Sequence, residues 1–285
     1  VEDVEFAPPI FINIYLSKQF FAESLKEIIK EGESFGRSEH AKGFKVMVEH
    51  TDPNPFKEFH IGHLMPNVIG STIARIFEWN GAEVKQANYQ GDKGLHVAKA
   101  VWAGGDYARG HKAYEEDPQA KKEIEEINKK IYDRSDSLIN AKYDKGKNES
   151  LEKFEEIYKR LDTKFDYYFF ESEAGEIGKK IVEENIGKIF EKSDGAIVFR
   201  GSHTRVFINS QGLPTYEAKE LGNAKIKYKK YPYDLSVVVT GYEIIDYFKV
   251  VLEAMEKVLP DLARKTKHIS HGMLRLPTGK MSSRT

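Results

Sequence analysis

The sequence predicts an α/β protein with a doubly wound parallel sheet that a mostly helical insertion splits into two halves. Three observations lead to this prediction: a strand–helix–strand pattern after residue 44, a Lys- and Glu-rich helical stretch over about 104–187, and alternating strands and helices again from residue 196. A strand, helix and strand at this spacing form a βαβ unit, so the strands should run parallel and bind ligands at their carboxyl ends.

Hydrophobic periodicity defines the elements of the first half. Alternating, Val-rich residues predict a strand, and apolar residues at helical spacing predict the helix that follows it. Gly81 is a natural stop for that helix. The expected elements are a strand at 44–51, a Pro-containing loop at 52–55, a helix at 62–80, a second strand at 83–88 and a loop at 89–94.

The middle of the chain is rich in Lys and Glu, which favours solvated helices with a polar break at Lys142–Ser150 and no catalytic role. After it, the strand pattern resumes as part of the same sheet. The expected elements there are strands at 196–200 and 205–209, a helix after Pro214, a buried strand at 235–240 and an amphipathic helix at 243–258.

These elements divide the chain into four predicted segments. They are a lead segment with a helix at 1–43, the first half of the sheet domain at 44–103, the helical insertion at 104–195 and the second half of the sheet domain at 196–285. Because the chain begins with Val1 and ends at Thr285 in a loop-like run, we expect it to be a piece of a longer protein.

Composition limits the chemistry of this 285-residue chain. Without cysteine there can be no disulfide framework, no Cys-ligated zinc or iron–sulfur cluster and no thiol nucleophile. No apolar run approaches the ~18 residues of a membrane span, so an integral membrane protein is not expected. The formal net charge of -1 creates no global positive field, so any nucleic acid must be bound by local patches.

A His-x-Gly-His motif stands between the first predicted strand and its helix, at His60-Ile61-Gly62-His63. A helix N-terminus presents free N–H groups with partial positive charge, and a glycine there lets a phosphate approach the backbone closely. Two imidazoles can add hydrogen bonds to phosphate oxygens. The motif therefore predicts a phosphate-binding helix start; a helix cap with two ordinary surface histidines is the alternative.

A second anion-binding motif stands at the end of the chain. The run Gly279-Lys280-Met281-Ser282-Ser283-Arg284 combines two cations and two hydroxyls with a glycine, which is a generic anion-binding arrangement. An exposed basic turn is the alternative interpretation. The two motifs occur together, in the order and at the ends of the split sheet that one family requires.

The motif pair resembles the HIGH and KMSKS signatures of class I aminoacyl-tRNA synthetases, and the flanking sequence is most similar to arginyl-tRNA synthetases. The resemblance covers roughly residues 4–102 and 196–285. It implies a Rossmann-type catalytic domain followed by an anticodon-binding domain, and we expect the latter to be absent from this chain. The similar blocks are Phe11–Leu16, Val48–Lys57, Asn88–Gly94 and His271–Thr285.

The resemblance implies ATP-dependent ligation of L-arginine to tRNA(Arg) through an arginyl-adenylate. Phosphoryl displacement depends on positioning and charge neutralisation more than on covalent help. The implied substrates and partners are ATP with its bound Mg2+, L-arginine and tRNA(Arg), and no metal held by the protein is expected. A cytoplasmic location without a membrane partner is also implied.

The resemblance further assigns roles to individual residues. A guanidinium is bound by acceptors placed in a planar fork, which carboxylates with a phenol or an amide can supply. The catalytic residues would be His60, His63, Lys57 and Lys280. ATP would be bound by Gly62, Gly241, Glu243, His271, Met273, Lys280, Ser282 and Ser283. Arginine would be bound by Glu49, Asp52, Asn54, Tyr216 and Glu220.

Three positions depart from the family pattern. Ser283 stands where the loop commonly carries a second lysine, and Lys57 is the nearest cation that could compensate. Glu220 stands where Asp is usual, which should move the carboxylate by one methylene. Ile244 stands where Gln is usual, which weakens the expected contact with the α-amino group.

A basic stretch ends the helix expected after Pro214. Its side chains are expected to lie at a solvated helix end, with tRNA phosphates as the alternative partner. The stretch consists of Lys225, Lys227, Lys229 and Lys230.

Three other functions remain open at this stage: a class I synthetase for a different amino acid, another His-x-Gly-His adenylyltransferase, and a non-catalytic paralogue that binds tRNA or nucleotide. Small nucleotidyltransferases lack the long insertion, and cysteine-specific synthetases need a thiolate-held metal that a chain without cysteine cannot make. The intact histidines and lysine of the two motifs argue against a loss of catalysis.

Overall fold

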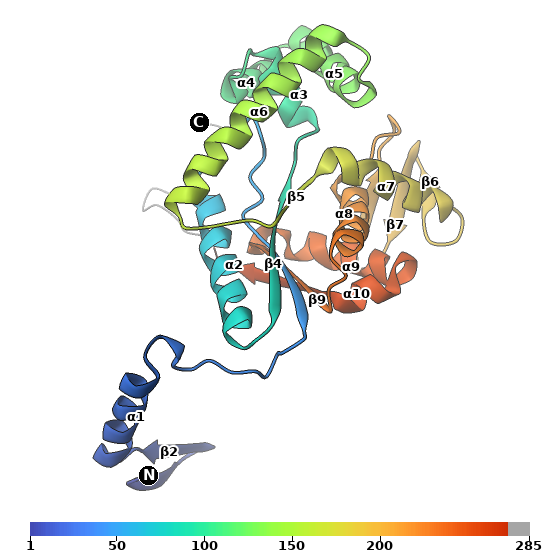
Figure 1. Ribbon diagram of the computed structural model, residues 1–285. Helices are drawn as coiled ribbons and strands as arrows, with labels where there is room; N and C mark the ends of the chain where they lie inside the picture. The colour runs from blue at the N-terminus through green and yellow to red at the C-terminus, as the bar shows by residue number, and fades with distance from the viewer. Residues whose placement is uncertain (273–285) are drawn as a thin grey trace.

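The computed structural model describes residues 1–272 and shows an α/β fold around one main sheet (Figure 1). Its five strands are parallel and lie in the order β10-β9-β3-β4-β5. Counted along the chain and read from the β5 edge, this order is 3-2-1-4-5, which is that of a Rossmann sheet, so the predicted fold class is confirmed. The strands are β3 (Lys45–Glu49), β4 (Glu83–Gln90), β5 (Tyr167–Phe170), β9 (Leu235–Gly241) and β10 (Thr266–His271).

Alternate residues of the central strand β3 face opposite layers of helices. Val46 and Val48 lie in one buried cluster with Ala74 of α2, whereas Met47 lies in another with Ala174 of α7. A strand that is covered on both faces needs apolar residues on both, which explains its nearly continuous apolar run. Figure 1 shows α2 (Ile61–Trp79) on one side of the sheet, and on the other α7 (Glu171–Glu184), α8 (Tyr216–Lys230), α9 (Ile245–Val258) and α10 (Pro260–Lys265).

The N-terminal elements stand apart from the main sheet at one end of the molecule (Figure 1). Strands β1 (Asp3–Ala7) and β2 (Phe11–Tyr15) pair antiparallel, and α1 (Lys18–Glu31) follows, with a short 3-10 turn, η1 (Gly32–Ser34). No residue of β1, β2 or α1 is buried. These elements therefore add nothing to the core that positions the sheet.

Four helices leave the sheet between β4 and β5. They are α3 (Leu95–Trp102), α4 (Tyr107–Glu116), α5 (Pro118–Asp133) and α6 (Ser137–Arg160). The predicted break at Lys142–Ser150 is wrong, because α6 runs through it. Within α6, the missing side chain of Gly146 makes room for the ring of Phe56, and the Phe56 N–H donates to Ser150 Oγ at 2.9 Å.

The sheet takes its edge strand from the interval 104–195, which we predicted to be a mostly helical insertion. Tyr167–Phe170 pairs with Ala87–Gln90, so β5 and the α7 that follows belong to the layers of the sheet. The same pairing corrects the loop predicted at 89–94, because Tyr89 and Gln90 continue β4. Both differences arise from one contact that is distant in the sequence.

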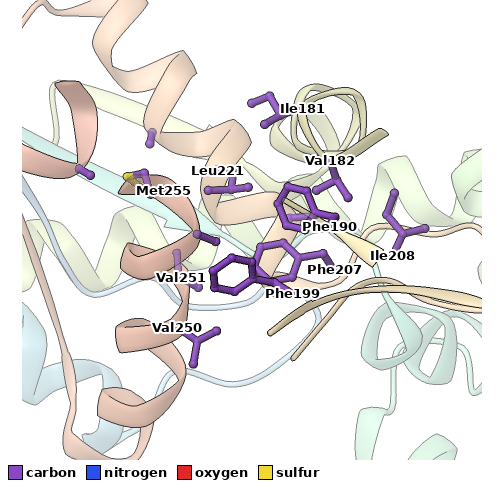
Figure 2. Packing of buried hydrophobic residues seen from close by; sticks show 14 of the residues in the cluster. Ile181, Val182, Phe190, Phe199, Phe207, Ile208, Leu221, Val250, Val251 and Met255 are labelled. Atoms are coloured by element: carbon purple, nitrogen blue, oxygen red, sulfur yellow. The ribbon is translucent and has the colours of Figure 1, made fainter. Parts of the chain in front are cut away.

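The strands predicted at 196–200 and 205–209 exist, but they do not join the main sheet. They form a separate antiparallel sheet, because the short connection between them permits a hairpin and not a parallel crossover. Phe199 and Phe207 from this sheet pack with Phe190 in a buried cluster against the helices (Figure 2). Its strands are β6 (Glu191–Ser193), β7 (Ala196–Arg200) and β8 (Thr204–Ile208).

Helices α7 and α8 approach each other closely at two glycines. A Cβ at Gly178 would overlap the carbonyl oxygen of Ala218, and a Cβ at Gly222 would overlap that of Ala174. Gly222→Ala is therefore expected to lower the free energy of unfolding by about 1–3 kcal/mol through overpacking. Urea denaturation measures this change, and Lys225→Ala on the exposed face of α8 is the control, expected to stay within about 0.5 kcal/mol. An unchanged midpoint for Gly222→Ala would contradict the close approach.

Candidate active site

A pocket of about 240 Å³ lies at the carboxyl ends of the central strands, beside the start of α2. It is lined from both sides of the boundary between β3 and β9, where the strand order reverses. Ligands of open α/β sheets bind in the crevice at this boundary. The pocket brings together these predicted site residues: Glu49, Asp52, Asn54, Gly62, Glu220 and Gly241.

The loop between β3 and α2 contains three residues with positive φ: Thr51 (φ 79), Asp52 (φ 44) and Phe56 (φ 68). Residues other than glycine rarely adopt this conformation, and such strain collects at functional sites. The turn brings the Asp52 carboxylate back to the sheet, where its Oδ1 accepts a hydrogen bond from the Tyr89 N–H at 2.7 Å. The local strain is thus tied to the placement of one acidic side chain in the pocket.

The two histidines of the His-x-Gly-His motif cap α2 and stack on each other. His60 Nδ1 accepts from the Gly62 N–H at 3.0 Å, His63 Nδ1 accepts from the His60 N–H at 3.2 Å, and the ring centroids are 4.0 Å apart. Burial, with Lys57 nearby, lowers the pKa of His60, and burial together with His60 lowers the pKa of His63 to about 3. In a neutral ring whose Nδ1 accepts, Nε2 carries the proton. The pair therefore supplies neutral N–H donors, and the cap that we named as the alternative is compatible with phosphate binding.

Four carboxylates line the pocket, and two of them are locked in buried ion pairs. Glu49 Oε2 lies 2.8 Å from Lys227 Nζ, and Glu171 Oε2 lies 2.6 Å from Lys219 Nζ. The two glutamates and two lysines of these ion pairs are each at most 6% exposed, so solvent screens neither pair. Glu49 and Glu171 are consequently fixed in place and neutralised within the protein.

The other two carboxylates, Asp52 and Glu220, form no ion pair with any residue in the part of the chain that the structure describes. Burial, reinforced by the neighbouring charge of Glu49, raises the pKa of Asp52 well above its usual range and that of Glu220 to about 8. Like charges held together in a site of low polarity disfavour double ionisation. A cationic ligand would therefore be stabilised in this pocket.

Several predicted site residues lie outside this pocket. Tyr216 begins α8 but is 53% exposed, so its ring does not line the pocket. Glu243 lies in the exposed 3-10 turn η2 (Tyr242–Ile244), and His271 ends β10 with its Nδ1 2.7 Å from Gly272 O. Lys57 lies over the ring of Tyr107, 4.9 Å from its centroid. Met273, Lys280, Ser282 and Ser283 fall outside the described residues.

Glu171 and Tyr89 are among the polar pocket residues that sequence analysis missed. Glu171 lies in the interval to which we assigned no catalytic role, although it directly follows the aromatic run Tyr167–Phe170. Had that run been taken as a parallel strand, Glu171 would have stood at the carboxyl edge of the sheet. Tyr89 also lines the pocket, and its buried hydroxyl has no hydrogen-bond partner among residues 1–272.

The prediction for the basic stretch is wrong at Lys227, which is buried at 3% exposure. Its ion pair with Glu49 removes it from solvent and from any tRNA phosphate. The other three lysines of the stretch are exposed, as expected: Lys225, Lys229 and Lys230.

The described part of the chain offers no preformed metal site. No group of three or more His, Cys, Asp or Glu side chains in it is placed to hold an ion. Within residues 1–272 there is also no helix with the length and apolarity needed to cross a membrane.

Residues 24–101, which contain β3, α2 and β4, match a protein-family model described as tRNA synthetases class I (R), catalytic domain. The matched part, with its two parallel strands and the capped helix between them, is thus similar to class I tRNA synthetase catalytic domains. The chain as a whole is similar to arginine–tRNA ligases. It is 29% identical over 309 residues to the arginine–tRNA ligase of Borreliella afzelii, an alignment that covers 96% of this chain and 53% of that protein.

A second relative and two solved structures are also similar to this chain. The arginine–tRNA ligase of Clostridium acetobutylicum is 29% identical over 307 residues, covering 99% of this chain and 54% of that protein. The fold is similar to that of the Plasmodium falciparum arginyl-tRNA synthetase, with TM-score 0.67, 22% identity and coverage of 95% and 52%. For the Thermus thermophilus arginyl-tRNA synthetase the TM-score is 0.60, with 22% identity and coverage of 98% and 56%. The chain spans about half the length of the curated relatives it matches.

Proposed function

We propose that this chain binds L-arginine and ATP and forms arginyl-adenylate, the first step of ATP-dependent ligation of arginine to tRNA(Arg). The observation that carries the proposal is the pair Asp52 and Glu220, two carboxylates that form no ion pair among residues 1–272 and that line a pocket at the switch point. A guanidinium supplies a permanent positive charge and five N–H donors in a planar fork. It would satisfy both carboxylates at once, and the relatives named arginine–tRNA ligase support the same substrate.

In the proposed step, a carboxylate oxygen of arginine bonds to the α-phosphorus of ATP while the bond to the bridging oxygen of pyrophosphate breaks. No proton has to move, so the protein contributes position and charge neutralisation. The neutral histidine donors and the positive end of α2 would hold phosphate oxygens. Lys57 and, by resemblance, Lys280 would neutralise the leaving pyrophosphate, with magnesium entering on the ATP.

The proposed arginine pose follows from the lining of the pocket. The carboxylates would hold the guanidinium, and Asn54 would hold the backbone end of the amino acid. Ile244 lines the pocket where the family usually has an amide, so the α-amino group needs another acceptor in this protein. A contact from Tyr216 requires its exposed ring to turn towards the pocket.

The remaining parts of the proposal come from the relatives. tRNA(Arg) would be the acceptor of the activated arginine, and a cytoplasmic location would go with a role in translation. The proposed catalytic domain comprises the two predicted halves, 44–103 and 196–285, together with β5 and α7.

Calorimetric titration with a non-hydrolysable arginyl-adenylate analogue tests the proposal directly, with the lysyl analogue as the matched control. The arginyl analogue is expected to bind roughly 100-fold more tightly, because a compact ammonium cannot pair with two separated acceptors. Arginine-dependent ATP–pyrophosphate exchange is expected to be weak or absent without tRNA(Arg). Equal affinity for the two analogues would contradict the guanidinium pocket, and robust exchange without tRNA would contradict the tRNA requirement.

A further inference from the structure

Helix α8 carries a buried polar stripe formed by Lys219, Asn223 and Lys227. These residues recur at i, i+4 and i+8, so they share one face of the helix. They are 4%, 0% and 3% exposed, although lysine is almost never buried unless it is paired. The burial of these three polar residues must therefore be explained by the groups that they contact.

Lys227 and Asn223 hold the same oxygen of Glu49. Lys227 Nζ lies 2.8 Å from Glu49 Oε2, and Asn223 Nδ2 donates to that oxygen at 3.0 Å. Lys227 Nζ also donates to Ser236 Oγ at 3.2 Å, which fixes it between α8 and β9. Glu49 Oε1 has no hydrogen-bond partner among the described residues, and Glu49 lines the arginine pocket.

We infer that Lys227 is a positioning residue for arginine recognition, which holds Glu49 by one oxygen and leaves the other for the guanidinium of the ligand. The inference rests on the proposed function. It concerns a residue that does not line the pocket but contacts Glu49, which does. Lys227 itself does not touch the ligand. It acts by holding the buried carboxylate of Glu49 in place and balancing its charge.

The electrostatic surroundings show what the loss of Lys227 would do. The titratable groups that face Glu49 and Lys227 are Asp52 from the β3–α2 loop, Tyr89 from β4, Glu220 from α8 and Tyr233 from the segment before β9. Burial alone would lower the pKa of Lys227, but Glu49 together with Tyr233 and Glu220 outweighs burial and raises that pKa, so Lys227 is charged at neutral pH. Without this cation, Glu49 would be a third unpaired carboxylate beside two others. Such a group takes up a proton.

The test uses three variants and measures arginine affinity by calorimetry between pH 6.0 and 8.5. Lys227→Met removes the cation and keeps an apolar stem, Lys227→Arg restores the charge, and Lys230→Met changes an exposed lysine on the same helix. Lys227→Met is expected to weaken arginine binding by roughly 30-fold or more at pH 6.5 relative to wild type. The ratio of the wild-type arginine affinity to that of Lys227→Met should become smaller towards pH 8.5, because Glu49 ionises again in the variant. The affinity of Lys227→Met for an ATP analogue should equal that of wild type. The arginine affinities of Lys227→Arg and Lys230→Met should lie within about threefold of wild type.

Three outcomes separate the alternatives. An equal loss of arginine and ATP-analogue binding, or an affinity ratio that does not change with pH, would overturn the inference and leave Lys227 a structural role only. If Lys227→Met does not fold, Asn223→Ala removes only the neutral donor to Glu49 and should still weaken arginine binding by about 2- to 10-fold; no change there would overturn the inference. A folded wild-type chain that binds ATP but no arginine would instead overturn the proposed function.

Discussion

Glu220→Gln is expected to abolish tight arginine binding while ATP binding stays near wild type. The substitution keeps the side-chain volume but removes one of the two pocket carboxylates that form no ion pair within residues 1–272. An underpaired guanidinium in a buried site costs roughly 2–5 kcal/mol, which corresponds to about 30- to 5,000-fold in affinity. Calorimetry with arginine and with an ATP analogue measures both parts of the expectation.

Two comparisons make the Glu220→Gln result specific. Glu217→Gln changes a buried glutamate one turn away on the same helix that does not line the pocket, and it should leave arginine affinity within about threefold of wild type. Citrulline has nearly the shape of arginine without its charge, so wild type should reject it and Glu220→Gln should discriminate less. Arginine affinity that is unchanged in Glu220→Gln would show that this residue is not the clamp.

Lys219→Met is expected to lower the free energy of unfolding by about 3–5 kcal/mol, a large share of the stability of a typical domain. Lys219 and Glu171 form an ion pair at 2.6 Å with both side chains at most 6% exposed. Removing the lysine leaves a desolvated carboxylate at the start of α7. Urea denaturation at pH 7 measures the loss, which should become smaller at pH 5 because Glu171, whose pKa burial already raises, can then be protonated.

The matched control for Lys219→Met is an exposed pair on α7. Lys180 lies 3.8 Å from Glu184, with the two side chains 76% and 59% exposed, so Lys180→Met should stay within about 0.5 kcal/mol. Replacing both members of the buried pair, as Lys219→Met with Glu171→Leu, should recover much of the stability, since no unpaired charge remains. A loss below about 1 kcal/mol in Lys219→Met would mean that water reaches this pair.

The parts of the fold that could be predicted are those whose signal is local. The first strand, the helix after it and the strand at 235–240 carry their own periodicity, so the sequence places them within a few residues. Strand β5 is only four residues long and lies between Lys- and Glu-rich helices, and its strand conformation depends on pairing with β4. The antiparallel arrangement of β7 and β8 likewise depends on which sheet the two strands join, and hydrophobic periodicity cannot predict the sheet to which a strand belongs.

The same distinction explains the site. Glu49, Asp52 and Asn54 lie in one contiguous motif, so the resemblance located them, and the structure brings them to one pocket. Lys227 was predicted to be solvated because a lysine near a helix end usually is. The burial of Lys227 depends on its ion pair with Glu49. Asn223 of the same helix also binds Glu49, and these two residues lie 174 positions apart in the sequence. A local sequence pattern cannot predict an ion pair between residues that are so far apart in the chain.

The strained loop between β3 and α2 has a consequence for how this protein can change. Glycine at Thr51 or Asp52 would relieve a left-handed backbone that costs a side-chain-bearing residue about 1 kcal/mol or more. Glycine in place of Asp52, however, would delete one of the acidic groups on which ligand choice is proposed to depend. Selection for heat tolerance therefore favours glycine in this short segment, whereas selection for substrate discrimination favours keeping Asp52. Directed evolution for thermostability alone should reduce substrate discrimination first through changes in this segment.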